Sequence, residues 1–192
     1  MIYKIAGLIC HQLPERSIFI GGEKLPFCAR CTGIYGSIFI FLVYFLIRKR
    51  FKGNYPPKTA LLIGAVCCLI PFMYDGGMSY LGIHETDNFL RIVTGSFAGL
   101  PLSFLALLLL NIKSTMDEGS KKKPIIKNLS DFLPLGLCLV ASYMTYTGKI
   151  PWHIPALISV LGFIFFFGLL IFIAGRALYE KLSKRNIKKR NT

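Results

Sequence analysis

Five long apolar runs alternate with short polar segments along the chain of 192 residues. The runs lie at 32–47, 59–74, 92–112, 132–147 and 154–174. A helix needs about 20 mostly apolar residues to cross the hydrocarbon of a bilayer, so the shorter runs cross only if neighbouring residues enter the headgroup region. The pattern predicts an all-α, multi-pass membrane protein with about five transmembrane helices.

Composition agrees with this class of protein. Apolar residues make up 54% of the chain, yet Lys and Arg number 23 against 9 Asp and Glu. A soluble domain does not normally combine these two extremes. The basic residues flank the apolar runs and form no basic domain interleaved with aromatics, so we expect no nucleic-acid partner and a lipid bilayer as the environment.

The positive charges also predict an orientation, because short loops rich in Lys and Arg stay in the cytoplasm. Along the chain, the six segments outside the runs carry 4, 5, 1, 5, 1 and 7 of them. This alternation predicts a cell-membrane protein with its N-terminus outside and its C-terminus inside. Three regions follow: an interfacial segment at 1–31, a helical bundle at 32–176 and a basic cytoplasmic tail at 177–192.

Three cysteines and a histidine precede the first apolar run. Cys10 and His11 are followed by Cys28 and Cys31, in the order C-H-x16-C-x2-C. Two clusters of sulfur and imidazole ligands separated by a loop are typical of tetrahedral zinc sites. We therefore predict a metal site, with Zn²⁺ as the ion. Adjacent residues point in different directions, so Cys10 and His11 both bind the ion only if the backbone turns there; otherwise His11 supports a ligand or contacts a substrate.

Two other interpretations of the cysteines remain open. Cys28 and Cys31 form a C-x-x-C pair, and Arg30 between them would lower a thiol pKa, as a thiol-disulfide exchange site requires. A disulfide from Cys10 to either of them would instead only fix the N-terminal segment to the first helix. The other cysteines lie inside apolar runs, where we expect them to pack as small apolar residues.

A second polar motif spans 75–91, between the second and third runs. Its glycines at 76, 77 and 82 are expected to break the helix, which would place Asp75 at the end of the second span. A new helix is expected near Glu85, with Thr86 or Asp87 as its N-cap and with Asn88 and Arg91 on one face. Ionisable side chains at membrane depth are costly and mark a candidate functional site.

The roles of this motif depend on whether it meets the cysteines. If it does, the protein is a candidate metalloenzyme for a lipid-linked or membrane-embedded substrate. Asp75 or Glu85 would then serve as general acid or base, and Asn88 and Arg91 would hold an anionic headgroup or oxyanion. If it does not, Asp75 or Asp87 simply neutralises Arg91 and anchors the loop.

Two further classes of function stay open. A membrane thiol oxidoreductase would need a second, exposed cysteine pair as a relay, and the vicinal Cys67 and Cys68 are a poor substitute. A transporter needs ionisable groups within several spans, and the fourth and fifth runs have almost none. The loop before the fifth run carries Trp152 and His153, which are typical of a membrane interface.

The order of the segments CHQ (10–12), PERS (14–17) and CARCTG (28–33) resembles the signature of an uncharacterised family of predicted integral membrane proteins, domain of unknown function 2085. The segment from Asp75 to Gly95 resembles the second motif of that family. The resemblance implies a small multi-pass membrane protein in which the two motifs belong together. It implies no particular activity.

Overall fold

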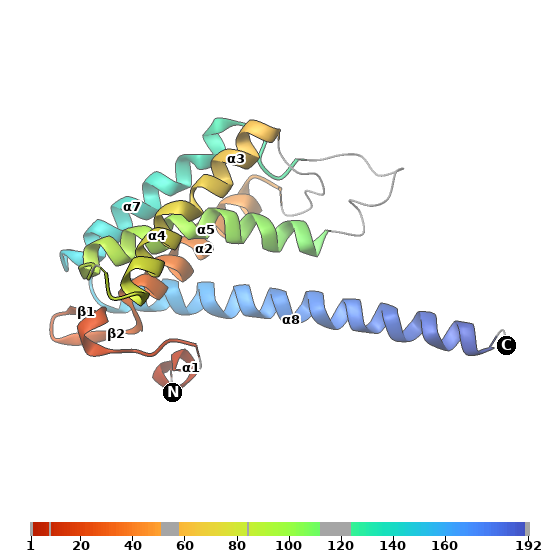
Figure 1. Cartoon of the computed structure of the whole chain (residues 1–192), viewed down its shortest axis with the longest axis horizontal. Helices are drawn as coiled ribbons and strands as arrows, with labels where there is room; N and C mark the ends of the chain where they lie inside the picture. Colours follow the sequence, from red (N-terminus) through yellow and green to blue (C-terminus); the bar gives the residue numbers. More distant parts are fainter. Residues whose placement is uncertain (1, 8, 51–57, 84, 112–123, 191–192) are drawn as a thin grey trace.

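The computed structural model describes residues 2–7, 9–50, 58–83, 85–111 and 124–190. In these ranges the protein is a helical bundle with one small β-hairpin (Figure 1). Five helices are long and apolar enough to cross a membrane: Ala29–Ile47, Thr59–Tyr80, Asn88–Leu110, Leu129–Tyr146 and His153–Tyr179. The prediction of a mainly helical protein with five candidate spans is confirmed.

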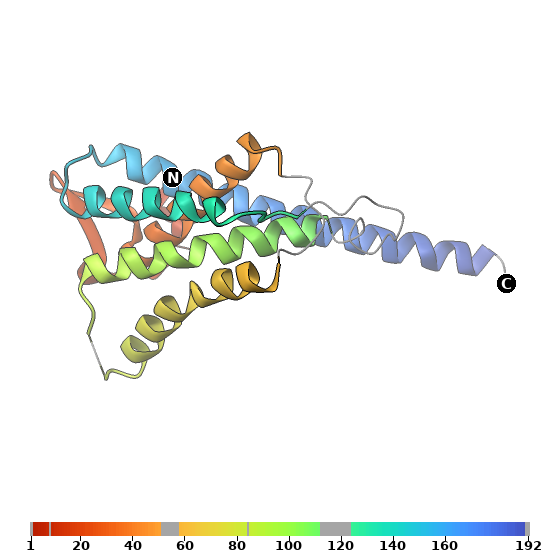
Figure 2. The same ribbon diagram turned by 90° about the horizontal axis from the view of Figure 1, so that it is seen from above.

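The first, third and fifth spans are single helices, named α2 (Ala29–Ile47), α5 (Asn88–Leu110) and α8 (His153–Arg190). The second is divided at Cys68 into α3 (Thr59–Cys67) and α4 (Leu69–Tyr80), and the fourth joins η2 (Leu129–Phe132) to α7 (Leu133–Tyr146). Helix α8 continues well past the predicted end at residue 174 and projects from the bundle (Figure 2). Residues 177–190 contain no glycine or proline and many good helix formers, so the helix continues past the glycine at 175.

Helix α2 lies at the centre of the bundle, against α5 and α8 (Figures 1 and 2). Its crossing with α5 is very close. A Cβ atom added to Gly33 would collide with the carbonyl oxygen of Ile92, and one added to Gly95 would collide with the carbonyl oxygen of Arg30. Small residues let two membrane helices bring their backbones together. The crossing therefore places the first turn of α2 beside the second turn of α5, directly after Arg91.

The N-terminal segment forms a short helix and a hairpin, which the prediction of an all-α fold did not include. Helix α1 (Ile2–Ala6) and the 3₁₀ turn η1 (Pro14–Arg16) precede strands β1 (Ser17–Ile20) and β2 (Glu23–Cys28). The turn residues Gly21 and Gly22 adopt φ of +60° and +84°, which glycine reaches without strain. Strands of four and six residues show too few alternations to stand out in the sequence.

The hairpin is attached to the helices by an aromatic contact. Phe27, near the end of β2, is 1% exposed, and its ring centroid lies 5.1 Å from that of Tyr35 on α2 and 5.5 Å from that of Phe163 on α8. Such aromatic pairs are worth about 0.5–1.5 kcal/mol beyond the area they bury. The residue that follows, Cys28, is therefore held at the entrance of the first span.

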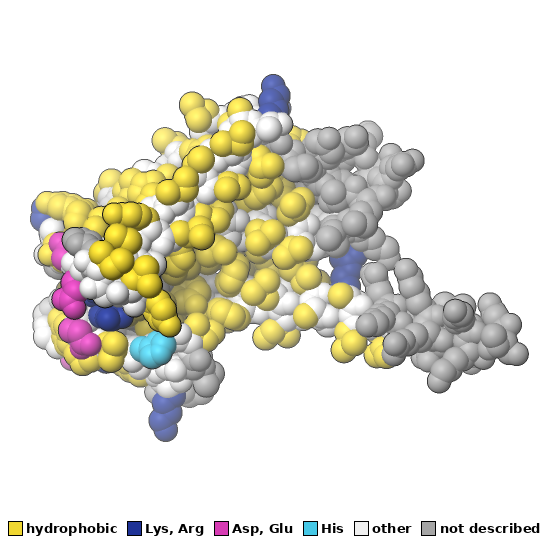
Figure 3. Space-filling model, viewed as in Figure 1, with side chains coloured by type: hydrophobic (Ala, Val, Ile, Leu, Met, Phe, Trp, Pro, Cys, Tyr) yellow, Lys and Arg dark blue, Asp and Glu magenta, His cyan; other side chains and the backbone are white. Residues whose placement is uncertain are grey.

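Large apolar side chains cover the outside of the bundle, as Figure 3 shows over the face in view. Exposed examples on the second span are Ile63, Val66, Ile70 and Met73. A surface of this kind suits lipid tails rather than water. Charged and histidine side chains gather at the end that carries the hairpin (Figure 3).

The opposite end of the bundle is fastened by a buried carboxylate. Asp131 in η2 is 0% exposed, forms an ion pair with Arg50 after α2, and accepts a hydrogen bond of 2.9 Å from the hydroxyl of Tyr44. The backbone N–H groups of Lys127 and Asn128 also donate to it. This network connects the first and fourth spans far from the hairpin.

Candidate functional site

The three cysteines of the N-terminal motif lie together. Cys10 follows α1, Cys28 ends β2 and is the N-cap of α2, and Cys31 lies in the first turn of α2. Their sulfur atoms all lie within 4.8 Å of one another, and the backbone N–H of Cys28 donates to the sulfur of Cys10 at 3.2 Å. The hairpin thus returns the chain from Cys10 to the start of the helix that carries the C-x-x-C pair.

Contact between the sulfurs changes how they hold protons. Hydrogen bonds from the thiols of Cys28 and Cys31 lower the pKa of the Cys10 thiol to about 2. The hydrogen bond with Cys10 raises the pKa of Cys28 in turn, because Cys28 keeps the proton that it donates. Of the two thiols, that of Cys10 therefore loses its proton more readily than that of Cys28.

His11 lies apart from this group. It is exposed, and it is not among the side chains whose ligand atoms lie within 4.8 Å of one another. The backbone does turn nearby, at Gln12, which has φ of +51°. Gln12 is fixed there because its Nε2 donates to the carbonyl oxygens of Tyr3 and Pro26, both at 2.8 Å.

A cavity of about 380 Å³ opens beside the three sulfurs. Its polar wall consists of the cysteines, His11, Gln12 and three arginines, Arg16, Arg30 and Arg91, and its apolar wall consists of Ile9, Leu13 and Tyr80. No Asp or Glu of the described residues lines it. Its volume lies in the usual range for small-molecule sites, about 300–1,000 Å³.

Asp75 lies behind this cavity and positions one of its arginines. Its Oδ2 accepts hydrogen bonds from Nε (2.9 Å) and Nη2 (2.5 Å) of Arg30 and from the hydroxyl of Thr94 (3.0 Å). Asp75 is 2% exposed and the Arg30 side chain 21%. The expectation that Asp75 neutralises Arg91 is therefore wrong, because the ion pair is made with Arg30.

The helix break expected after Asp75 is also wrong. Helix α4 continues through Gly76 and Gly77 to Tyr80, and only Gly82, with φ of +67°, lies in the turn that follows. Single glycines inside a helix cost only about 1 kcal/mol each, and lipid offers the backbone no other hydrogen-bond partner. As a result, Asp75 is carried on a helix that faces α2 and α5.

Arg91 and Asn88 occupy one face of α5, as predicted. Arg91 Nη1 donates to Asn88 Oδ1 at 3.3 Å, and Asn88 Nδ2 donates to the carbonyl oxygens of Ser17 (3.1 Å) and Glu15 (3.3 Å). Asp87 is the N-cap, and its side chain accepts from the backbone N–H of Leu90. Asn88 thereby ties the loop before the hairpin to the helix that presents Arg91.

The other predicted side chains lie away from the cavity. Glu85 is exposed, and it does not line the cavity wall. Trp152 and His153, at the start of α8, are also outside the lining residues. The two motifs therefore meet through Arg30, Asp75, Asn88 and Arg91, and Glu85 does not share in that contact.

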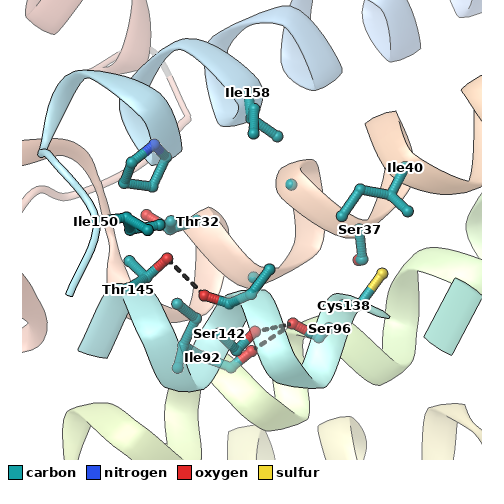
Figure 4. Close-up of a pocket in the computed structure, with 14 residues that line it drawn as sticks. Thr32, Ser37, Ile40, Ile92, Ser96, Cys138, Ser142, Thr145, Ile150 and Ile158 are labelled. Carbon is teal, nitrogen blue, oxygen red and sulfur yellow. Dashed lines mark hydrogen bonds between the residues drawn. The ribbon is translucent and has the colours of Figure 1, made fainter. Parts of the chain in front are cut away.

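A second cavity lies inside the bundle, between α2, α5, α7 and α8 (Figure 4). Its volume is about 50 Å³, enough for a few water molecules only. Hydroxyl groups line it, but they are already hydrogen-bonded: Ser96 pairs with Ser142 at 2.8 Å, and Thr145 donates to the carbonyl oxygen of Ala141 at 2.7 Å. The cavity is too small for a substrate site, and none of the described residues that line it has a buried polar atom without a partner.

Sequence reasoning did not assign two of the three arginines to the site. Arg16 is next to Glu15 and is indistinguishable from a solvated pair, and Arg30 was considered only as a neighbour of the thiols. One feature of the sequence does indicate that Arg30 and Arg91 lie close together. Each is followed within four residues by a glycine of the helix crossing, Gly33 or Gly95.

Together, the fold and the cysteine cluster define a multi-pass helical membrane protein with a thiol-rich site at one end of its bundle. Comparison with known proteins agrees, because residues 10–105 match the family model of predicted membrane proteins named DUF2085. The chain belongs to this family, and the match contains both motifs.

Two curated relatives are similar to the chain. An uncharacterized protein of Methanocaldococcus jannaschii is 40% identical over 107 residues, which is 55% of this chain and 66% of the relative. An uncharacterized protein of Methanothermobacter thermautotrophicus is 40% identical over 102 residues, 53% of this chain and 86% of the relative. No solved structure matches the chain significantly.

Proposed function

We propose that the protein is a zinc-binding membrane protein in which Cys10, Cys28 and Cys31 hold Zn²⁺ at the wall of a basic cavity. The observation that carries this proposal is the convergence of three thiols from separate parts of the chain within 4.8 Å. Thiolates are preferred ligands of this borderline-soft ion. Cys28 and Cys31 form a C-x-x-C pair at the start of α2. The hairpin brings the chain back so that Cys10 lies beside this pair.

The dimensions of the cluster suit this ion. Zinc–sulfur bonds of about 2.3 Å in a tetrahedron bring sulfur atoms to about 3.8 Å from one another. The observed upper limit of 4.8 Å exceeds that spacing by only about 1 Å. The thiolate on Cys10 supplies the first negative charge, and binding of the ion releases the protons of the other two thiols.

The fourth position distinguishes a structural from a catalytic ion. Four protein ligands close a structural zinc site, whereas a catalytic site keeps one position for water or substrate. Three sulfurs leave one position, and the cavity lies beside them. His11 is on the cavity wall and would need to rotate toward the sulfurs to close it.

We propose the open form, with a membrane-embedded or lipid-linked substrate in the cavity. Bound zinc would supply a water of pKa about 7 or polarise a substrate oxygen. Asp75 serves to position Arg30 in this account, since its Oδ2 already accepts from Arg30 and Thr94, while its Oδ1 is buried without a hydrogen-bond partner among the described residues. A role of Glu85 as general acid or base stays a prediction.

We also propose that the site faces the outside of the cell membrane. The hairpin and the 75–91 segment share one end of the bundle, whereas Arg48, Arg50 and Lys58 lie at the opposite end, and basic loops stay inside. The test is an impermeant maleimide applied to intact cells, with the wild-type protein as background. Glu23→Cys in the hairpin should react and Lys58→Cys should not; the reverse result would invert the orientation.

Metal content tests the zinc proposal. The wild-type protein, purified in detergent, should contain about one zinc per chain by elemental mass spectrometry, and Cys28→Ser should lose most of it. Cys138→Ser is the matched control, because Cys138 is a buried cysteine in α7, outside the cluster. A protein without metal whose intact mass is lower by two hydrogens would contradict the proposal and favour a disulfide or a thiol-exchange site.

A further inference from the structure

The geometry points to a second property of the same cavity: we infer that Arg91, with Arg16 and Arg30, binds the phosphate group of a ligand. This inference deepens the proposed function and rests on it for the use of the cavity as one site. Its evidence is separate, because it comes from the arginines and not from the sulfurs.

Arg91 is the central observation. Its residue is only 8% exposed, it lines the cavity, and its Nε is buried without a hydrogen-bond partner among the described residues. A buried donor of a charged group costs several kcal/mol when it is left unpaired, so native proteins rarely leave one without a purpose. Among the described residues, the side chain that accepts a hydrogen bond from Arg91 is that of Asn88, through its neutral amide oxygen. Its charge therefore has no ion-pair partner in the part of the chain that the structure describes.

The charges around the cavity favour an anion with more than one negative charge. Three guanidinium groups line it, and within the described part of the chain only that of Arg30 is in an ion pair, with Asp75. Zn²⁺ bound by three thiolates would carry a net charge of −1. The three arginines outweigh this charge, so the cavity stays positive. Guanidinium groups bind phosphate through pairs of parallel hydrogen bonds, which suits the unpaired edge of Arg91. The N-terminus of α2 adds a favourable dipole at the same place.

The apolar wall indicates where the rest of the ligand lies. Ile9, Leu13 and Tyr80 are all exposed large apolar side chains at the rim, and Tyr80 is 91% exposed. Tyr80 is the last residue of the second span, whose outer surface is apolar. A phosphate on an acyl or prenyl chain would place its charge on the arginines and its first carbons on this rim. A free phosphate compound would use the arginines alone.

The experiment is calorimetric titration of the full-length protein in neutral detergent. The probes are inorganic pyrophosphate, short-chain phosphatidic acid and, as a lipid without net charge, short-chain phosphatidylcholine. Arg91→Gln should weaken binding of both anions by about tenfold or more, the loss expected for one charge-assisted hydrogen bond. Arg16→Gln, at an exposed residue, should weaken it severalfold. Arg48→Gln removes the same charge from the opposite end and should leave affinity within about twofold.

The outcomes separate the possibilities. Tighter binding of phosphatidic acid than of pyrophosphate identifies a lipid phosphate, and equal binding identifies a soluble phosphate compound. No binding by the wild type, or equal losses in Arg16→Gln and Arg48→Gln, overturns the inference.

The titrations are repeated after zinc has been removed with a chelator. Binding that then disappears in every variant assigns the anion to the metal and overturns only this inference; arginine-dependent binding in a protein that never contains zinc overturns only the zinc proposal.

Discussion

The ion pair between Asp75 and Arg30 should be necessary for both stability and ligand binding, and Asp75→Asn tests this. The substitution keeps the shape and an acceptor for Thr94 but removes the charge. Removing one partner of a buried ion pair costs about 3–5 kcal/mol. Because the Arg30 side chain is 21% exposed and gains some water, we expect a loss of about 2–3 kcal/mol in the free energy of unfolding. Unfolding in mixed micelles with rising dodecyl sulfate, followed by circular dichroism, measures it.

Asp131→Asn is the matched control. Asp131 is also a buried carboxylate paired with an arginine, but it lies at the opposite end of the bundle. We expect a stability loss at least as large, since two backbone N–H groups lose their charged acceptor as well. Pyrophosphate affinity should fall severalfold in Asp75→Asn and stay unchanged in Asp131→Asn, because only Asp75 positions an arginine of the cavity.

A double-mutant cycle isolates the pair. Asp75→Asn combined with Arg30→Met removes both charges, so the double variant should recover about 2 kcal/mol relative to the sum of the single losses. Strictly additive losses, or a loss below about 0.5 kcal/mol in Asp75→Asn, would refute the assignment of this ion pair.

Two other predictions follow from the packing and from the sulfurs. Gly95→Ala should destabilise the protein by about 1–3 kcal/mol because its methyl group overlaps the α2 backbone, whereas Gly76→Ala, with nothing within 4 Å, should be neutral or stabilising by up to about 1 kcal/mol in the same assay; equal effects would contradict the close crossing. In the metal-free protein, the lowered pKa of Cys10 should keep one thiolate ionised at pH 7 and below, seen as ultraviolet absorbance that Cys10→Ser removes and Cys138→Ser keeps. Absorbance that develops only above pH 8 would contradict the lowered pKa of Cys10.

The spans could be predicted from sequence because a run of about 20 apolar residues is a requirement of the bilayer itself. The N-cap at Asp87 and the pairing of Asn88 with Arg91 could be predicted because both are local, within one helix turn. The hairpin could not, since its short strands gain their stability from Phe27 packing against α2 and α8, contacts that the local pattern does not contain.

The partner of Asp75 was the main failure of prediction in the site. Arg30 and Arg91 both lie near one end of the spans, and the sequence alone gives no distance to either. The choice is made by the α2–α5 crossing, in which Gly33 and Gly95 bring the two motifs together and leave Arg30 facing α4. The prediction that Gly76 and Gly77 end the helix was wrong because glycine breaks helices mainly where water can bind the freed backbone groups. In lipid the backbone keeps its helical hydrogen bonds.

The central claim is that three thiolates hold zinc and leave one position open to the cavity. X-ray absorption spectroscopy at the zinc edge of the purified protein tests it most directly. The account predicts three sulfur neighbours at about 2.3 Å and one oxygen or nitrogen neighbour at about 2.0–2.1 Å. A shell of four sulfurs, a shell with fewer than three, or a protein that contains no zinc would contradict it.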